Sequence, residues 1–126
     1  MLLCSFVNSH QWRDTNYIDV INLDEIKAIS VRGGEMYVTN TYDIQVFFDV
    51  GSHQTHCVSV SIKRGIIKPS SVLEDKFISV VTTELLNEIG NKARYISISS
   101  IVHNALSSVY KLMPPEKVFY KYKYAE

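Results

Sequence analysis

The sequence predicts an α+β protein in which an antiparallel β-meander in the N-terminal half is covered by two C-terminal helices and followed by a final short strand. The chain is rich in β-branched residues, with Val occurring 14 times, Ile 13 times and Thr six times against four Ala, and such side chains favour strands. Apolar residues alternate with polar ones in the first half and recur every four residues after Pro69, which are the spacings of strands and helices.

The length of 126 residues fits one domain over residues 1–126. We expect it to consist of a β-rich half (1–69), a helical segment (70–113) and a terminal strand (114–126).

The first strands are predicted at residues 17–22 and 27–32, on either side of a turn at residues 23–25. Gly33 and Gly34 then provide the positive-φ pair that a tight hairpin turn favours. Residues 36–38 are expected to continue the chain on the far side of that turn.

The clearest alternation lies in residues 44–50 and 56–62, joined by a turn at residues 51–52. The side chains expected on one shared face are Ile44, Val46, Phe48, Val50, Val58, Val60 and Ile62. This apolar face needs a cover, and we expect Phe48 to be buried against the helix that follows.

Residues 69–71 mark the internal boundary, because Ser71 followed by Glu74 matches the capping box that starts a helix. Every fourth residue is then apolar, namely Leu73, Phe77, Val81, Leu85 and Ile89. Gly90 is expected to end this helix. Residues 76–83 are β-branched enough that a strand remains an alternative there.

A second helix is predicted to begin near Ser97 or Ser99 and to end before Pro114. Its two apolar rows are Ile101, Ala105, Val109 and Met113, and Val102, Leu106 and Tyr110. Residues 118–124 alternate with period two, which predicts the final strand.

The sequence carries no phosphate-cradling Gly loop and no Gly-x-Ser-x-Gly, His-Glu-x-x-His or Cys-x-x-Cys motif. We therefore expect no catalytic, cofactor-binding or metal-binding residues. Two cysteines are too few for a disulfide framework in a chain of this length. Together with the short, non-basic apolar start and the lack of a membrane span, this favours a cytoplasmic protein.

A weak candidate for a polar site consists of His53, His56, Cys57 and His103. Imidazole and thiolate bind zinc, and Cys4 or His10 could complete a ligand set. However, strand alternation directs His56 and Cys57 to opposite faces. A Cys57–His nucleophilic pair would in addition need a lowered thiol pKa. We favour a polar loop followed by a half-buried cysteine.

Charge is distributed unevenly although the net charge is zero. Residues 1–89 contain seven Lys and Arg against 11 Asp and Glu, whereas residues 90–126 contain six against two. The basic end includes our candidate interface, Phe119, Tyr120, Lys121, Tyr122, Lys123 and Tyr124. Alternating Tyr and Lys suit either an edge strand that self-associates or base stacking with phosphate contacts.

These observations predict a small, non-enzymatic, intracellular binding module that acts through protein–protein interaction or self-association, with a dimer favoured. Eight tyrosines support an interface. A compact chain without motifs is typical of phage and mobile-element accessory proteins. Two alternatives remain: nucleic-acid binding by the basic C-terminal third, and small-ligand (nucleotide) binding or hydrolysis in a pocket between sheet and helices.

Overall fold

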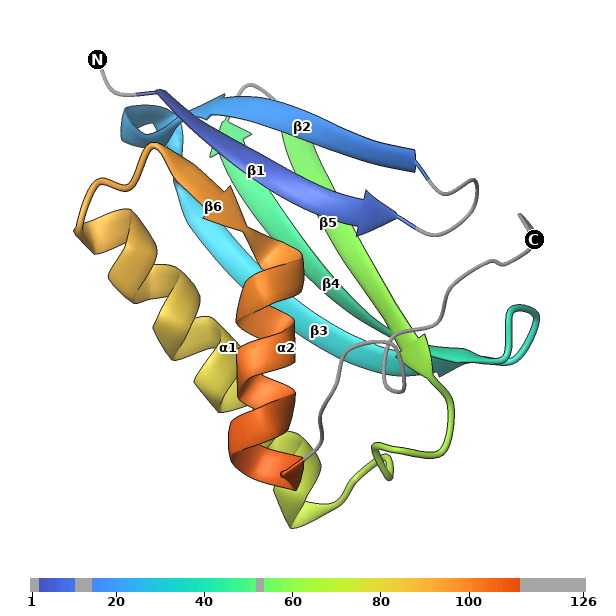
Figure 1. Ribbon diagram of the computed structural model, residues 1–126. Coiled ribbons are helices and arrows are strands. Elements are labelled where there is room, and N and C mark those ends of the chain that lie inside the picture. Colours follow the sequence, from blue (N-terminus) through green and yellow to red (C-terminus); the bar gives the residue numbers. More distant parts are fainter. Residues whose placement is uncertain (1–2, 11–14, 52–53, 112–126) are drawn as a thin grey trace.

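The computed structural model describes residues 3–10, 15–51 and 54–111. They form two three-stranded sheets and two α-helices (Figure 1). The elements in chain order are β1 (Leu3–His10), β2 (Thr15–Asn22), the 3₁₀ turn η1 (Leu23–Glu25), β3 (Ala28–Met36), β4 (Thr41–Gly51), β5 (Gln54–Lys63), α1 (Val72–Gly90), β6 (Tyr95–Ser97) and α2 (Ile98–Tyr110). The predicted α+β class is confirmed.

Strands β3, β4 and β5 form the antiparallel meander that the sequence predicted. The register places Val46 opposite Val31 on one side and Val58 on the other, so the alternating apolar residues of the three strands share one face. We call this the inner face, because the helices cover it. Phe48 is fully buried on it, as expected.

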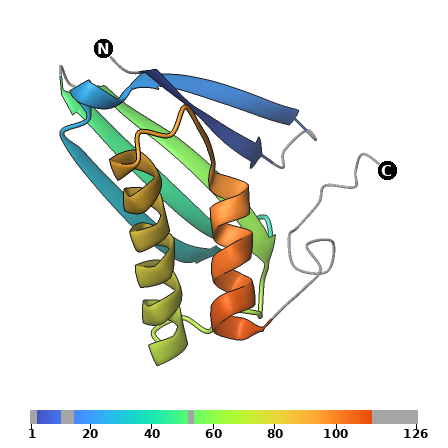
Figure 2. The ribbon, with the colours of Figure 1, turned by 60° about the vertical axis from the view of Figure 1, so that its left-hand side comes forward.

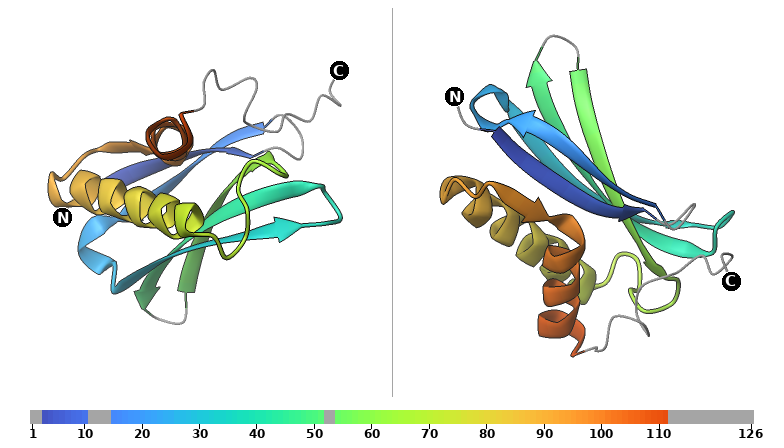
Figure 3. Two further views of the ribbon diagram at one scale, coloured as in Figure 1. Left: turned by 90° about the horizontal axis from the view of Figure 1, so that it is seen from below. Right: turned by 45° about the horizontal axis from the view of Figure 1, so that its top comes forward.

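The second sheet was only partly predicted. β1 pairs antiparallel with β2 and parallel with β6, in the order β2-β1-β6. β1 also lies against β5, and β6 leads directly into α2 (Figure 3). β1 and β6 were missed because apolar and polar residues do not alternate regularly in the eight residues of β1, and because β6 has only three residues.

The two helices lie side by side and cover the inner face (Figure 2). One buried apolar cluster joins them to the sheet. Its largest fully buried side chains are Tyr42, Phe48, Phe77, Ile44, Ile62, Ile67, Leu85, Ile96, Ile98, Leu106 and Val46. None of the helices in the described residues is long and apolar enough to cross a membrane.

Helix α1 begins after Ser71, as predicted, but the return bond of the capping box goes to Ser70, one residue earlier than the N-cap. The backbone N–H of Glu74 donates to Ser71 Oγ over 3.1 Å, and the Glu74 carboxylate accepts from the backbone N–H of Ser70 over 2.7 Å. Residues 76–83 are helical, because Phe77 and Val81 reach the core only at helical spacing. The strand alternative for that segment is wrong.

Helix α2 begins after Ser97, whose Oγ accepts from the backbone N–H of Ser100. It ends at Tyr110, where Lys111 takes the left-handed conformation with φ 59°. Met113, Pro114 and the predicted strand at residues 118–124 lie outside the described residues.

The predicted turn at Gly33 and Gly34 is wrong. Both residues lie within β3, opposite Ile44 and Asp43, and the chain turns at residues 37–40 instead. The ring and hydroxyl of Tyr42 occupy the space that a side chain at Gly33 would need. Gly33 is therefore used for a close approach by an aromatic residue and not for a turn.

Candidate functional site

The β3–β4 hairpin ends in an exposed apolar tip, which we define as residues 36–40. Asn40 has φ 58°, and its backbone N–H donates to the Tyr37 carbonyl over 3.3 Å, which closes the turn. The side chains of Met36, Tyr37 and Val38 are 45%, 69% and 98% exposed. Three successive apolar residues in water are unusual for a turn, because loops normally carry polar residues.

Tyr37 is held in one orientation by two charged neighbours. The Arg64 guanidinium lies over its ring, 3.9 Å from the centroid. The Tyr37 hydroxyl donates to Glu35 over 3.2 Å, and Arg64 bridges the same carboxylate over 3.5 Å. Cation–π stacking and a hydrogen bond at the two ends of the side chain fix the aromatic ring before any partner arrives.

The base of the hairpin is anchored to the helical layer. The buried Tyr42 hydroxyl donates to the Glu74 carboxylate, which also caps α1. Burial, this hydrogen bond and the negative charge of Glu74 raise the pKa of Tyr42 far above its ordinary value. Burial and the same carboxylate also raise the pKa of Tyr110, whose ring meets Phe77 edge to face at 6.1 Å.

On the outer face of the sheet, a short hydrogen-bond chain holds the same base. Thr39 and Thr41 are joined through their hydroxyls over 2.6 Å. Asp43 accepts from Thr41 over 2.8 Å and from Ser61 over 2.7 Å. Thr41 is fully buried and Ser61 nearly so, so both find polar partners there. The tip therefore projects from a base that is fixed on both faces of the sheet.

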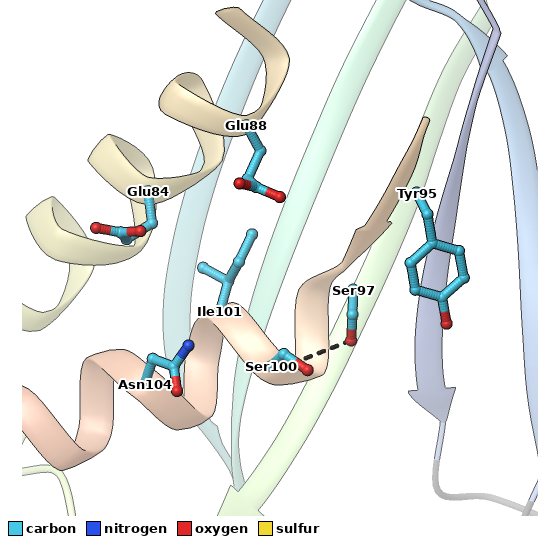
Figure 4. Close-up of a pocket in the computed structure, with 7 residues that line it drawn as sticks. All are labelled: Glu84, Glu88, Tyr95, Ser97, Ser100, Ile101 and Asn104. Carbon is cyan, nitrogen blue, oxygen red and sulfur yellow. Dashed lines mark hydrogen bonds between the residues drawn. The ribbon is translucent and has the colours of Figure 1, made fainter. Parts of the chain in front are cut away.

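A second feature is a groove of about 340 Å³ between α1, β6 and α2. Its lining residues are Glu84, Glu88, Tyr95, Ser97, Ser100, Ile101 and Asn104 (Figure 4). Glu84 and Glu88 extend from α1, whereas the Tyr95 ring lies at the opposite end of the groove. Ser97 and Ser100 are joined by the cap of α2. The polar groups do not converge on one point, so the groove does not form a catalytic constellation.

The weak polar candidates do not form a compact site in the described residues. His56 is half-buried on the inner face of β5, whereas Cys57 is exposed on the outer face opposite Phe47, as the alternation predicted. The expectation of a half-buried cysteine is therefore wrong. The thiol is nevertheless partly desolvated by its neighbours, which raises its pKa and opposes thiolate formation. His103 is half-buried on α2, and His53 lies outside the described residues.

No group of three or more His, Cys, Asp or Glu placed to hold a metal ion occurs in the part of the chain that the structure describes. The candidate interface from Phe119 to Tyr124 lies outside that part, so Tyr120, Lys121, Tyr122, Lys123 and Tyr124 keep their status as a prediction.

The hairpin tip itself was missed. Sequence reasoning assigned the turn to the glycine pair, and this assignment places residues 36–38 in a strand. One residue could have indicated the turn. Asn40, which follows Tyr37, Val38 and Thr39, is of a type that tolerates the left-handed conformation found in turns.

No family model, curated protein or solved structure matches the chain. The function must therefore be argued from the chemistry of these surfaces.

Proposed function

We propose that the protein is a non-enzymatic binding module that recognises a protein partner through the hairpin tip. The observation that carries this proposal is the fixed Tyr37 ring, stacked under Arg64 and hydrogen-bonded to Glu35, beside an almost fully exposed Val38. Tyr and Arg dominate the binding energy of protein interfaces. A ring that is already immobilised loses little conformational entropy on binding.

The chemistry of the tip favours a protein over a charged polymer. Its aromatic and aliphatic groups suit an apolar pocket. Tyr37 is held by two charged residues, Arg64 and Glu35, and these two pair with each other. A protein surface that binds nucleic acid would instead present several Lys or Arg side chains to the phosphates. The partner that fits is a protein with a concave apolar pocket for Val38 and a shelf for the Tyr37 ring.

Two observations support a non-enzymatic role. The raised pKa of Cys57 opposes its use as a nucleophile. The groove between α1 and α2 carries Glu84 and Glu88, whose negative charge would repel the phosphates of a nucleotide. Nucleic-acid binding by the basic C-terminal third remains an alternative that rests on the sequence alone, as does an origin in a phage or mobile element.

The experiment compares three full-length baits in affinity purification from the native host. Wild-type protein and the control Val72→Asp, which changes an exposed apolar residue on α1, should recover the same partner. The double variant Tyr37→Ser, Val38→Asp should not recover it. Calorimetry with the purified partner should then show binding weakened at least about tenfold by Tyr37→Ser.

Equal recovery and equal affinity for the tip variant and the wild type would refute the proposal. A melting temperature measured for each bait excludes loss of folding as the cause. Binding that disappears steeply with added salt, and that survives the tip substitutions, would favour the nucleic-acid alternative.

A further inference from the structure

Strand β3 lies at one edge of its sheet. Within the described residues it pairs with β4 on one side, and no strand pairs with its other side. None of its nine residues is buried. The β5 edge differs, because β1 lies against that strand (Figure 1). The β3 edge therefore presents backbone donors and acceptors that a further strand can pair with.

This edge lacks the usual protection against pairing. Natural edge strands are guarded by Pro, by outward Lys, or by being very short, and β3 has nine residues with neither Pro nor Lys. Its two charged side chains are turned onto the protein itself. Arg32 lies over the Phe47 ring at 4.9 Å, and Glu35 bonds Arg64 and Tyr37. Gly33 and Gly34 leave a stretch of backbone without side chains.

We infer that the β3 strands of two copies of this chain pair antiparallel across a two-fold axis at Val31, which joins two three-stranded sheets into one six-stranded sheet. A two-fold axis makes one surface serve both copies. This seam adjoins the hairpin tip, because Glu35 at its end also accepts from the Tyr37 hydroxyl. The inference rests on the free edge of β3 and not on the function proposed above.

The register follows from charge. Lys27 lies directly before β3, where its backbone N–H still donates to the Asp49 carbonyl over 2.6 Å. Pairing about Val31 sets Lys27 of each copy opposite Glu35 of the other, where its ammonium group would join the pair that Glu35 already forms with Arg64. Each dimer would contain this contact twice. Opposite charges that face each other across paired strands are stabilising.

The neighbouring registers are less favourable. A two-fold axis at Arg32 would place that guanidinium directly opposite its own copy. An axis at Ser30 would leave Glu35 without a strand partner, because the residue at the opposite position, Glu25, lies in the 3₁₀ turn η1. Like charges directly opposite each other destabilise a strand pair, so the axis at Val31 is selected.

The dimer would carry its two hairpin tips at opposite ends of the joined strands. Val38 is seven residues from the axis along the chain, so at about 3.3 Å per residue the two Val38 positions lie about 45 Å apart. Such an arrangement would present two copies of the tip to a repetitive or dimeric partner.

The test uses charge exchange in the full-length chain, measured by sedimentation and light scattering. Wild-type protein should have about twice the mass of the 14.4 kDa chain at micromolar concentration. Lys27→Glu alone and Glu35→Lys alone should each weaken the dimer about tenfold or more, because each places like charges opposite each other at two positions. An equimolar mixture of the two variants should restore wild-type affinity. In the mixed dimer the carboxylate introduced in one copy faces the ammonium group introduced in the other, and the unchanged Lys27 faces the unchanged Glu35.

Lys68→Glu, the same charge change at an exposed loop residue, is the matched control and should dimerise as the wild type does. Melting temperatures establish that every variant folds. Tyr37→Ser should also remain a dimer, so failure of the tip proposal and failure of this inference are distinguishable.

Three results would overturn the inference: a monomeric wild type up to high micromolar concentration, single variants that dimerise as well as the wild type, or a mixture that does not recover. Loss of the dimer in Tyr122→Glu, with Lys27→Glu still dimeric, would assign the interface to the C-terminal segment instead. Nitroxide labels at Val38→Cys, in a chain with Cys4→Ser and Cys57→Ser, should report a separation of about 45 Å. A dimer without that distance would contradict the Val31 register.

Discussion

Two ends of one hairpin use aromatic residues in opposite ways. Phe48, toward the end of β4 that is remote from the tip, is fully buried between the sheet and the helices, whereas Tyr37, at the tip, is 69% exposed. Phe48 is held within the buried apolar cluster of the core, and Tyr37 is held by a cation and a hydrogen bond. Burial stabilises the fold around Phe48, while Tyr37 is fixed without being removed from water.

The difference teaches that a rigid aromatic residue need not be a core residue. Removing a buried ring leaves a cavity, which destabilises the folded state. Removing an exposed ring changes little in the folded state and takes away a contact that only a partner would complete. Stability and binding should therefore separate cleanly along this hairpin.

The largest effect is expected at Phe48. Phe48→Ala should lower the free energy of unfolding by about 3–5 kcal/mol, because it removes a ring from the apolar cluster that joins β4 to α1. Denaturant unfolding measures the difference. Phe47→Ala is the matched control on the same strand, since Phe47 faces the outer side and is half-buried under Arg32. Its expected cost is only about 1 kcal/mol.

Equal costs for the two substitutions would contradict the assignment of inner and outer faces. A small cost for Phe48→Ala alone would indicate that the helices do not close over β4.

A smaller effect is expected at the junction between hairpin and helix. Tyr42→Phe removes the hydrogen bond to Glu74, which should cost about 1–2 kcal/mol at neutral pH. It should also change the response to alkali. The pKa of Tyr42 is raised in the folded protein, so above about pH 10 the unfolded chain releases the tyrosine proton first and the wild type loses stability as the pH rises.

The variant lacks this titrating group, so its melting temperature should fall less steeply above about pH 10. Tyr95→Phe, which removes an exposed hydroxyl, should follow the wild-type curve. A Tyr42→Phe curve parallel to the wild type would show that the buried hydroxyl does not control the alkaline response.

The core could be predicted from the sequence because it depends on short-range spacing. Ile44, Val46 and Phe48 share a face at period two, and Phe77, Val81 and Leu85 share one at a spacing of four residues. Local capping chemistry at Ser71 located the start of α1 for the same reason. Each of these features depends only on residues that are close together in the sequence.

The tip and the groove depend on contacts between distant residues, which spacing does not reveal. The Tyr42 side chain packs on Gly33, so the glycine pair lies within β3 and the turn lies at residues 37–40. Arg64, which directly follows the C-terminal end of β5, stacks on Tyr37 of the β3–β4 turn. The groove combines α1, β6 and α2, and β6 itself exists only through parallel pairing with β1. The sequence therefore predicted the class of fold better than the surfaces it would expose.

The smallest effect on stability is expected at Arg64. The Arg64–Glu35 bridge is partly exposed, with the two side chains 34% and 16% accessible, and surface pairs of this kind contribute about 1 kcal/mol or less. Arg64→Met keeps a long unbranched side chain but loses the charge, so its melting temperature should stay close to that of the wild type. The order parameters of the tip residues should nevertheless fall, because the cation that stacks on the Tyr37 ring is removed.

Nuclear magnetic resonance relaxation at Tyr37 and Val38 measures this order. Arg64→Lys separates the causes, since it retains the charge near Glu35 but not the planar group that stacks on the ring, and its order should lie between the other two. If Tyr37 stays as rigid in Arg64→Met as in the wild type, the turn itself and not the arginine fixes the ring. If its order falls while stability is kept, Arg64 serves the exposed surface and not the fold, which is the distinction between the two ends of the hairpin.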